Sequence, residues 1–141
     1  GLRPVAYADA EVPLGNGRFM IEPMVLARLI QSLQPQAEDK AMVVAAGCGY
    51  GAAVLARLVA SVVAVEADAG LAGAAQRTLR DLAITNVQQV AGPAEQGAAA
   101  SAPYDVILIE GAVGEVPAAI VDQLAEGGRL ATVISDPSGA L

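Results

Sequence analysis

The sequence predicts a single α/β domain with a mostly parallel β-sheet. Three short runs, at 42–46, 61–66 and 105–109, are mainly apolar and rich in β-branched residues. Strands of a parallel sheet that is covered on both faces have this composition. Segments with apolar residues at helical spacing separate the runs, and strands that alternate with helices form right-handed βαβ units. A chain of 141 residues, 55% of them hydrophobic, is long enough for one core.

The first part of the chain divides into an arm and a leading helix. Residues 1–21 form an N-terminal arm, rich in glycine and proline, whose sequence predicts no particular structure. A helix is expected over 22–34, because Pro23 suits a first helical turn and Pro35 follows the last apolar residue. Its apolar residues share one face: Val25, Leu26, Leu29, Ile30 and Leu33. The α/β core is then expected over 42–134.

The core begins with a short strand over 42–46 that leads into three glycines. A helix over 52–59 returns the chain to a second strand, 61–66, which is rich in valine. Asp68 is expected to cap the next helix, because its carboxylate can accept hydrogen bonds from the free N–H groups of the first turn. The apolar stripe of that helix is Leu71, Ala75, Leu79 and Leu82.

A weaker third strand is expected over 87–91 and a strong fourth strand over 105–109. The segment between them, 93–103, is rich in alanine and has no apolar period, which predicts a surface loop. Asp105 opens the fourth strand at the edge of the sheet opposite the glycine loop. We therefore interpret its carboxylate as structural.

The last helix is predicted to begin at Pro117 and to end at Gly127 and Gly128. Its apolar residues are Ile120, Val121 and Leu124. A fifth strand follows over 129–134, and its segment from Leu130 onward is uncharged, β-prone and free of proline. Such a strand is typical of an unprotected sheet edge, so we expect two copies to pair through it as a homodimer.

The segment Ala-Ala-Gly-Cys-Gly-Tyr-Gly at 45–51 joins the first predicted strand to its helix. Glycines allow the backbone to approach a ligand closely, and free N–H groups at a helix start favour negative charge. Glu66 ends the next strand, 19 residues after Gly47, where its carboxylate can accept hydrogen bonds from both hydroxyls of a ribose. The pattern predicts a nucleoside-containing ligand. The spacing also fits a dinucleotide fingerprint, so alone it does not separate NAD from S-adenosylmethionine.

Longer motifs extend this pattern along the chain. They are Gly49-Tyr50, the segment 52–59, Val65-Glu66, Asn86-Val87, the segment 102–107, Glu115-Val116-Pro117, Asp122-Gln123-Leu124 and the segment 127–130. In order, and without a large gap from about Pro23 to Ile134, they resemble the protein-L-isoaspartate O-methyltransferase family. The resemblance implies a Rossmann-like class I methyltransferase fold that uses S-adenosylmethionine, with central strand order 3-2-1-4-5. The antiparallel strands that follow the fifth strand in that fold are expected to be missing here.

The sequence departs from the family pattern at several positions. The family's acidic residue before the loop is Val43 here, and the first loop glycine is Ala45. The family's Gly-Asp-Gly after the third strand becomes the segment 92–94, Gly-Pro-Ala, which removes a carboxylate expected near the adenine. Two lost charge-assisted hydrogen bonds, at about 1.5–3 kcal/mol each, would weaken cofactor binding by about two to three orders of magnitude. Ile21 aligns with the active-site serine, so we expect no repair of isoaspartyl peptides.

The resemblance implies a set of cofactor-binding residues and leaves the catalytic residues unknown. The set is Ala45, Gly47, Gly49, Glu66, Ala67, Ala94 and Glu110. Glu110 follows the fourth strand, where this fold exposes its active-site edge, and is expected near the substrate or the sulfonium. Structural interpretations remain open for both carboxylates, since Glu66 could be a solvated strand end.

Three residues near the loop receive other interpretations. Cys48 has no base beside it in a chain without histidine, so it is interpreted as a small residue that fills a tight loop. Tyr50 is expected either to pack over the loop or to contact the ligand. Met24 is expected in the core.

The composition excludes several classes of function. The chain has no histidine, which excludes imidazole-based catalysis and histidine-ligated zinc, and no metal is expected. One cysteine excludes an internal disulfide and favours a reducing, cytoplasmic location. A net charge of −7 with 8 Lys and Arg residues argues against binding to nucleic acid or to an anionic membrane.

Three functions are consistent with these observations. The first is methyl transfer from S-adenosylmethionine to an acceptor that the sequence does not identify, a protein or peptide among the candidates. The second is a degenerate binding module that keeps the fold without turnover. The third is an NAD-dependent oxidoreductase, which is the weakest because no candidate proton relay or substrate domain follows the core.

Overall fold

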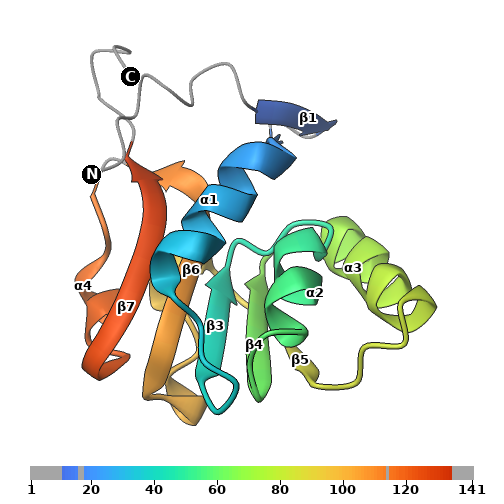
Figure 1. The fold of residues 1–141 in the computed structure, drawn as a ribbon. Coiled ribbons are helices and arrows are strands. Elements are labelled where there is room, and N and C mark those ends of the chain that lie inside the picture. Colours follow the sequence, from blue (N-terminus) through green and yellow to red (C-terminus); the bar gives the residue numbers. More distant parts are fainter. Residues whose placement is uncertain (1–10, 16–17, 114, 135–141) are drawn as a thin grey trace.

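A computed structural model of the chain describes residues 11–15, 18–113 and 115–134. At its centre lies a sheet with the spatial strand order β5 (Val87–Ala91), β4 (Ser61–Glu66), β3 (Lys40–Val44), β6 (Tyr104–Val113) and β7 (Leu124–Ile134). Each neighbouring pair of these strands is parallel (Figure 1). The predicted α/β class and the order 3-2-1-4-5 are thereby confirmed.

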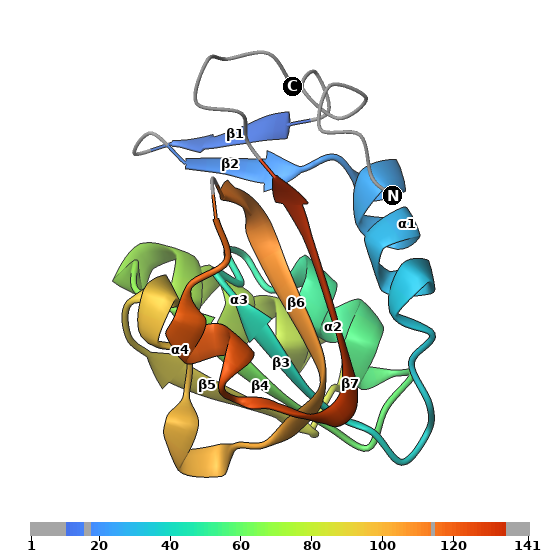
Figure 2. The same ribbon diagram turned by 90° about the vertical axis from the view of Figure 1, so that its left-hand side faces the viewer.

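Helices cover both faces of the sheet (Figures 1 and 2). One face carries α1 (Pro23–Leu33), α2 (Tyr50–Ala56) and α3 (Ala69–Asp81); the other carries α4 (Ala118–Val121) and two short 3-10 turns, η2 (Ala94–Gln96) and η3 (Ala99–Ser101). Side chains alternate along β3, so that Val43 packs under the helices of the first face while Val44 packs on the second. Both are at most 1% exposed, which explains the continuously apolar run in the sequence.

The leading helix is one residue shorter at each end than the predicted 22–34 and has the predicted buried face. Glu22 caps α1 by accepting a hydrogen bond from the N–H of Met24 over 3.2 Å, and Pro23 is its first residue. All five predicted apolar residues of α1 are buried. The expectation that Met24 belongs to the core is wrong: its side chain is 61% exposed, because it lies off the stripe that starts at Val25.

The next two helices differ from the prediction at their ends. α2 begins at Tyr50 and ends at Ala56, rather than running over 52–59, and the side-chain amide of Asn86 donates to the carbonyl of Ala56 over 2.8 Å. Asp68 caps α3 as predicted, accepting from the N–H of Leu71 over 3.0 Å. Leu82 follows the last turn of α3 and is 44% exposed, so its assignment to the buried stripe is wrong.

The predicted final helix is much shorter than expected. α4 ends at Val121, and Leu124 belongs to β7, where it pairs with Tyr104. The cause is Gln123, which is 5% exposed: its carbonyl accepts from the N–H of Tyr104 over 2.8 Å. Its side-chain amide also bonds to the N–H of Ala98 and the carbonyl of Gln96. These bonds fix the chain against the sheet before a second helical turn can form.

The predicted surface loop and the arm both contain structure. Ala94, Ala98 and Ala102 pack against the core from the segment 93–103, which forms η2 and η3. In the arm, β1 (Glu11–Gly15) and β2 (Arg18–Ile21) form an antiparallel hairpin. The hairpin lies across the carboxyl end of β6 (Figure 2). Asp105 has the predicted structural role, because its carboxylate accepts from the N–H of Lys40 over 2.9 Å.

Candidate functional site

The loop after β3 bends sharply at the carboxyl edge of the sheet. Ala45, Gly47 and Gly49 all have left-handed backbone angles, with φ of 57°, 58° and 89°. The N–H of Ala46 donates to the carbonyl of Val65 over 3.0 Å, which holds the loop beside β4. The chain therefore uses two glycines and one strained alanine to turn from β3 into α2.

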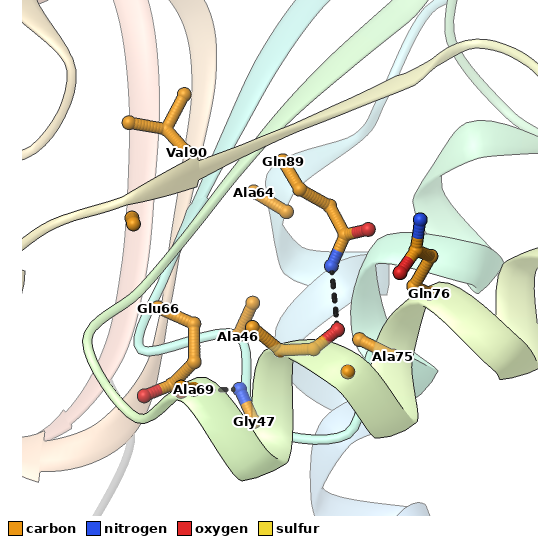
Figure 3. A pocket seen from close by; sticks show the side chains of 12 residues that line it. Ala46, Gly47, Ala64, Glu66, Ala69, Ala75, Gln76, Gln89 and Val90 are labelled. Atoms are coloured by element: carbon orange, nitrogen blue, oxygen red, sulfur yellow. Dashed lines mark hydrogen bonds between the residues drawn. The ribbon is translucent and has the colours of Figure 1, made fainter.

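Glu66 binds this loop directly. Its carboxylate is 5% exposed and accepts hydrogen bonds from the N–H of Gly47 over 2.7 Å and from the N–H of Asp68 over 2.8 Å. Figure 3 shows the side chain of Glu66 directed at Gly47. These two contacts tie the end of β4 to the glycine loop and to the residue that caps α3. The interpretation of Glu66 as a solvated strand end is wrong.

The glycines that follow permit close packing. A Cβ atom on Gly49 would lie 2.8 Å from the Cβ of Ala75 in α3, so this glycine allows α2 and α3 to approach. A Cβ atom on Gly51 would lie 1.6 Å from Oε1 of Glu110. Gly51 was not among the predicted site residues, although it belongs to the same glycine-rich segment.

Glu110 is a buried carboxyl group at the carboxyl end of the sheet. It is 7% exposed, and its Oε1 has no hydrogen-bond partner among the described residues. Burial raises the pKa of Glu110 to about 8, and the negative charge of Glu66 adds to the rise, while the backbone amide of Gly51 acts against it. The group is therefore largely protonated at neutral pH in the absence of a cation.

Two cavities open on either side of this edge. The first, of about 390 Å³, lies between α3 and the strands β4 and β5 and is lined by Gly47, Glu66 and small residues of α3. Gln76 and Gln89 supply its polar side chains, and the amide of Gln89 donates to the carbonyl of Ala72 over 3.0 Å (Figure 3). The second cavity, of about 120 Å³, lies on the opposite face. Its lining is Val44, Ala94, Glu95, Ile109, Pro117 and Ile120.

The predicted site residues are only partly brought together. Gly47 and Glu66 line the first cavity, whereas Ala94 lines the second. Ala67 is exposed beside Glu66, and Glu110 contributes to neither cavity. Gln89 and Glu95 were missed, because neither belongs to a motif and only the fold brings them to this edge.

The two other residues of the loop differ in their surroundings. Cys48 is half-buried, in keeping with a residue that fills the turn. Tyr50 is 46% exposed at the start of α2, which is consistent with either expectation, packing over the loop or contact with a ligand.

Comparison with known proteins identifies the family. The family described as Protein-L-isoaspartate(D-aspartate) O-methyltransferase (PCMT) matches residues 1–139. The chain belongs to this family. It is 40% identical over 134 residues to a protein-L-isoaspartate O-methyltransferase of Koribacter versatilis, which covers 95% of this chain and 60% of that protein. The predicted resemblance is confirmed.

The solved structures agree with the sequence comparison. A protein-L-isoaspartate O-methyltransferase superimposes with a TM-score of 0.75 at 30% identity, covering 85% of this chain and 39% of that one. A methyltransferase from Thiobacillus denitrificans, solved with S-adenosyl-L-homocysteine, gives a TM-score of 0.65 at 20% identity over 77% of this chain and 46% of that one. At 20% identity, the similarity to the Thiobacillus denitrificans protein shows only that the two chains share a fold. The chain spans about 60% of the length of the curated relatives that it matches.

None of the described helices is both long enough and apolar enough to cross a membrane.

Proposed function

We propose that this chain forms the cofactor-binding part of an S-adenosylmethionine-dependent methyltransferase. The observation that carries the proposal is Glu66, a buried carboxylate that ends β4 and holds the glycine loop through Gly47. A carboxylate in that position, beside a glycine turn at the carboxyl edge of a parallel sheet, suits the two hydroxyls of a ribose. Membership of the family supports the choice of cofactor.

The residues of the edge fit this cofactor. The Glu66 carboxylate is an acceptor suited to ribose hydroxyls, and Ala67 follows it without a bulky side chain. Gly47 and Gly49 let the backbone of the loop approach the ligand. Glu110 lies at the same edge, and its Oε1 is buried against Gly51 without a hydrogen-bond partner among the described residues. When bound, S-adenosylmethionine supplies a methyl group on a sulfonium sulfur.

The second cavity is the place that we propose for the adenine. Its walls are mostly apolar, and Ala94 and Ile109 leave room for a flat ring. The carboxylate of this region that the family resemblance led us to expect is absent, since Pro93 stands in its place. Glu95 lies two residues further on and lines the same cavity, so its carboxylate is available to the exocyclic amine.

The chain's other contribution to the reaction is alignment and exclusion of water. A carboxylate acceptor is nucleophilic without a general base, so a chain without histidine can support its methylation. Val43 is fully buried in the apolar core, where the family resemblance leads us to expect an acidic residue. For this reason we propose weaker cofactor binding than in a family member with all three carboxylates.

Titration calorimetry tests the proposal. S-adenosylmethionine, S-adenosylhomocysteine and NAD are titrated against the chain and against Glu66→Ala, with thermal unfolding as the check that the variant folds. We expect both adenosyl compounds to bind more tightly than NAD, and the variant to lose most of that binding. Tighter binding of NAD, or binding that survives in folded Glu66→Ala, would overturn the proposal. No binding of all three at about millimolar concentration would favour the degenerate module.

The acceptor is a separate question. Ile21 aligns with the family's serine, and its side chain is not among those that the structure describes. We propose that isoaspartyl peptides are not methylated, because isoleucine has no hydroxyl group. Transfer of radiolabelled methyl groups to an isoaspartyl peptide, compared with an authentic repair enzyme, tests this. Comparable turnover would show that the serine is dispensable.

A further inference from the structure

Glu66 and Glu110 flank the end of β3 on two neighbouring strands. Val44 pairs with Val65 on one side and with Ile109 on the other, so each glutamate lies one residue beyond the pair. Because side chains alternate along a strand, both glutamates belong to the face of the sheet that carries α2. Two strand spacings, about 10 Å, separate their backbones. Neither cavity is lined by Glu110, so its carboxyl group would act on a ligand at this edge through its charge and not as a wall of the cavities.

Glu110 has an unusual environment for an acidic side chain. It is 7% exposed, and its Oε1 has no hydrogen-bond partner among the described residues. The atom lies against Gly51, where any larger residue would collide with it. The charged group that acts on it most is Glu66, which has the same sign. A buried acceptor without a partner is costly, so one that is retained needs an explanation such as a ligand.

We propose that Glu110 enables this site to distinguish the positively charged S-adenosylmethionine from its demethylated product, S-adenosylhomocysteine. The inference rests on the proposed function. The two compounds differ in one positive charge, on a sulfur atom that a single carbon joins to the ribose. In this proposal the sulfur of a ribose-bound ligand lies between the two strand ends that carry Glu66 and Glu110. The ammonium group lies three carbons beyond the sulfur and is common to both compounds.

The electrostatics at this edge favour a positively charged ligand. With Glu66 nearby, a cation beside Glu110 is attracted by two carboxylates, whereas an uncharged sulfur gains nothing from either charge. Burial and Glu66 hold the pKa of Glu110 near 8 in the free protein. A bound cation lowers that pKa, so binding of the sulfonium compound releases a proton at neutral pH. Binding of the product does not.

The test compares Glu110→Gln with the unchanged chain. The substitution keeps the size of the side chain and removes its ability to ionise. The exposed carboxylate of Glu126 lies at the opposite edge of the sheet, and Glu126→Gln is the matched control. Calorimetric titrations with both adenosyl compounds, each in two buffers of different ionisation enthalpy, give the affinities and the number of protons released. Thermal unfolding verifies that each variant is folded.

We expect the unchanged chain and Glu126→Gln to prefer the sulfonium compound and to release a proton on binding it. In Glu110→Gln the ratio of the two affinities falls by about tenfold or more, and the proton release disappears. A ratio that is unchanged, or affinities for both compounds that fall equally, would overturn the inference while the proposed function stands. If the unchanged chain binds neither compound, the proposed function fails first.

Discussion

The carboxylate of Glu66 accepts a hydrogen bond from the backbone N–H of Gly47 over 2.7 Å, joining the end of β4 to the loop after β3. The second oxygen accepts from the N–H of Asp68 over 2.8 Å, just before α3 begins. One buried side chain therefore fixes the loop before α2 and the turn before α3. A ligand that contacts Glu66 therefore meets an edge that is already ordered.

This arrangement predicts a cost for Glu66→Gln. An amide has one acceptor oxygen, so one of the two backbone N–H groups loses its partner where only 5% of the side chain is exposed. We expect the free energy of unfolding to fall by about 1–3 kcal/mol, as measured by urea denaturation. The exposed Glu126→Gln should change it by less than about 0.5 kcal/mol. Equal stability of Glu66→Gln and the unchanged chain would contradict the role of Glu66 in the loop.

Much of the fold is predictable from the sequence because its determinants are local. The runs of valine and isoleucine are buried on both faces, and the stripe of α1 is buried as expected. The final helix was predicted wrongly because Gln123 acts through contacts with residues about 25 positions away, including Ala98. An isolated glutamine has no sequence signal for such a bond, so helical spacing of Ile120 and Leu124 misled the prediction.

The candidate site was predictable where chemistry follows from spacing. Gly47 and Glu66 meet as expected, because a glycine turn and the end of the next strand must share one edge of a parallel sheet. The close packing of Gly51 against Glu110 depends on how α2 lies over β6, which the spacing of residues does not specify. The same holds for Glu95, which lies on the opposite face of the sheet in the second cavity.

The left-handed backbone of Ala45 predicts that a glycine at this position stabilises the protein. Its φ of 57° is left-handed, a conformation that costs an alanine about 1–2 kcal/mol and a glycine almost nothing. After allowance for the greater freedom of glycine in the unfolded chain, Ala45→Gly should stabilise the protein by about 0.5–1 kcal/mol. Ala46, which is 2% exposed and has no positive φ, is the control, and Ala46→Gly should destabilise it. Chemical denaturation gives the free energy of unfolding of both variants and of the unchanged chain. If Ala45→Gly is less stable than the unchanged chain, Ala45 is not strained.

The close contact between Gly51 and Glu110 predicts that a larger residue at position 51 destabilises the protein. In Gly51→Ala the new Cβ would lie 1.6 Å from Oε1 of Glu110, so the two groups must move apart at a cost of about 1–3 kcal/mol. Gly73 lies in α3, and a Cβ atom on it would lie 3.8 Å from its nearest neighbour, Nη1 of Arg77. Gly73→Ala should therefore stabilise the helix by about 0.5–1 kcal/mol.

The coupling is measured with a double-mutant cycle. Glu110→Ala removes the colliding atom, so Gly51→Ala should cost less in that background than in the unchanged chain. Thermal unfolding of the four proteins gives the interaction. Strictly additive effects would mean that the two residues do not share this space.

Glu110 also predicts how stability depends on pH. Its pKa is about 8 in the folded protein and 4.5 as an unperturbed carboxyl, because of burial and the nearby charge of Glu66. Between these values the folded state holds a proton that the unfolded state has lost, so this group lowers stability as pH rises. The slope approaches about 1.4 kcal/mol per pH unit for a single group.

Glu110→Gln should remove that contribution. Relative to the unchanged chain, the variant should become progressively more stable as pH increases from about 5 to about 8, with the smallest difference at the acidic end. Urea denaturation of both proteins at intervals across this range provides the comparison. A difference that stays constant with pH would show that Glu110 is ionised throughout.

The edge strand β7 predicts self-association. Among the described residues β7 pairs only with β6, and no described strand pairs with its outer side. The segment from Leu130 to Ile134 is uncharged and has no proline, and such edges recruit further strands. Pairing of β7 with β7 of a second copy around a two-fold axis would close both edges in one step. Light scattering over a range of concentrations should therefore detect dimers.

A charge on this strand should prevent the pairing. Val133→Lys puts a charge on the edge strand, and exposed edges that carry lysine pair poorly, so the monomer fraction should rise. Val121→Lys is the matched control. Val121 is 49% exposed on α4, so this substitution adds the same charge outside the edge strand. Association that is equal in both variants would assign it to another surface. A chain that is monomeric at every concentration would mean that the outer side of β7 is covered within one molecule.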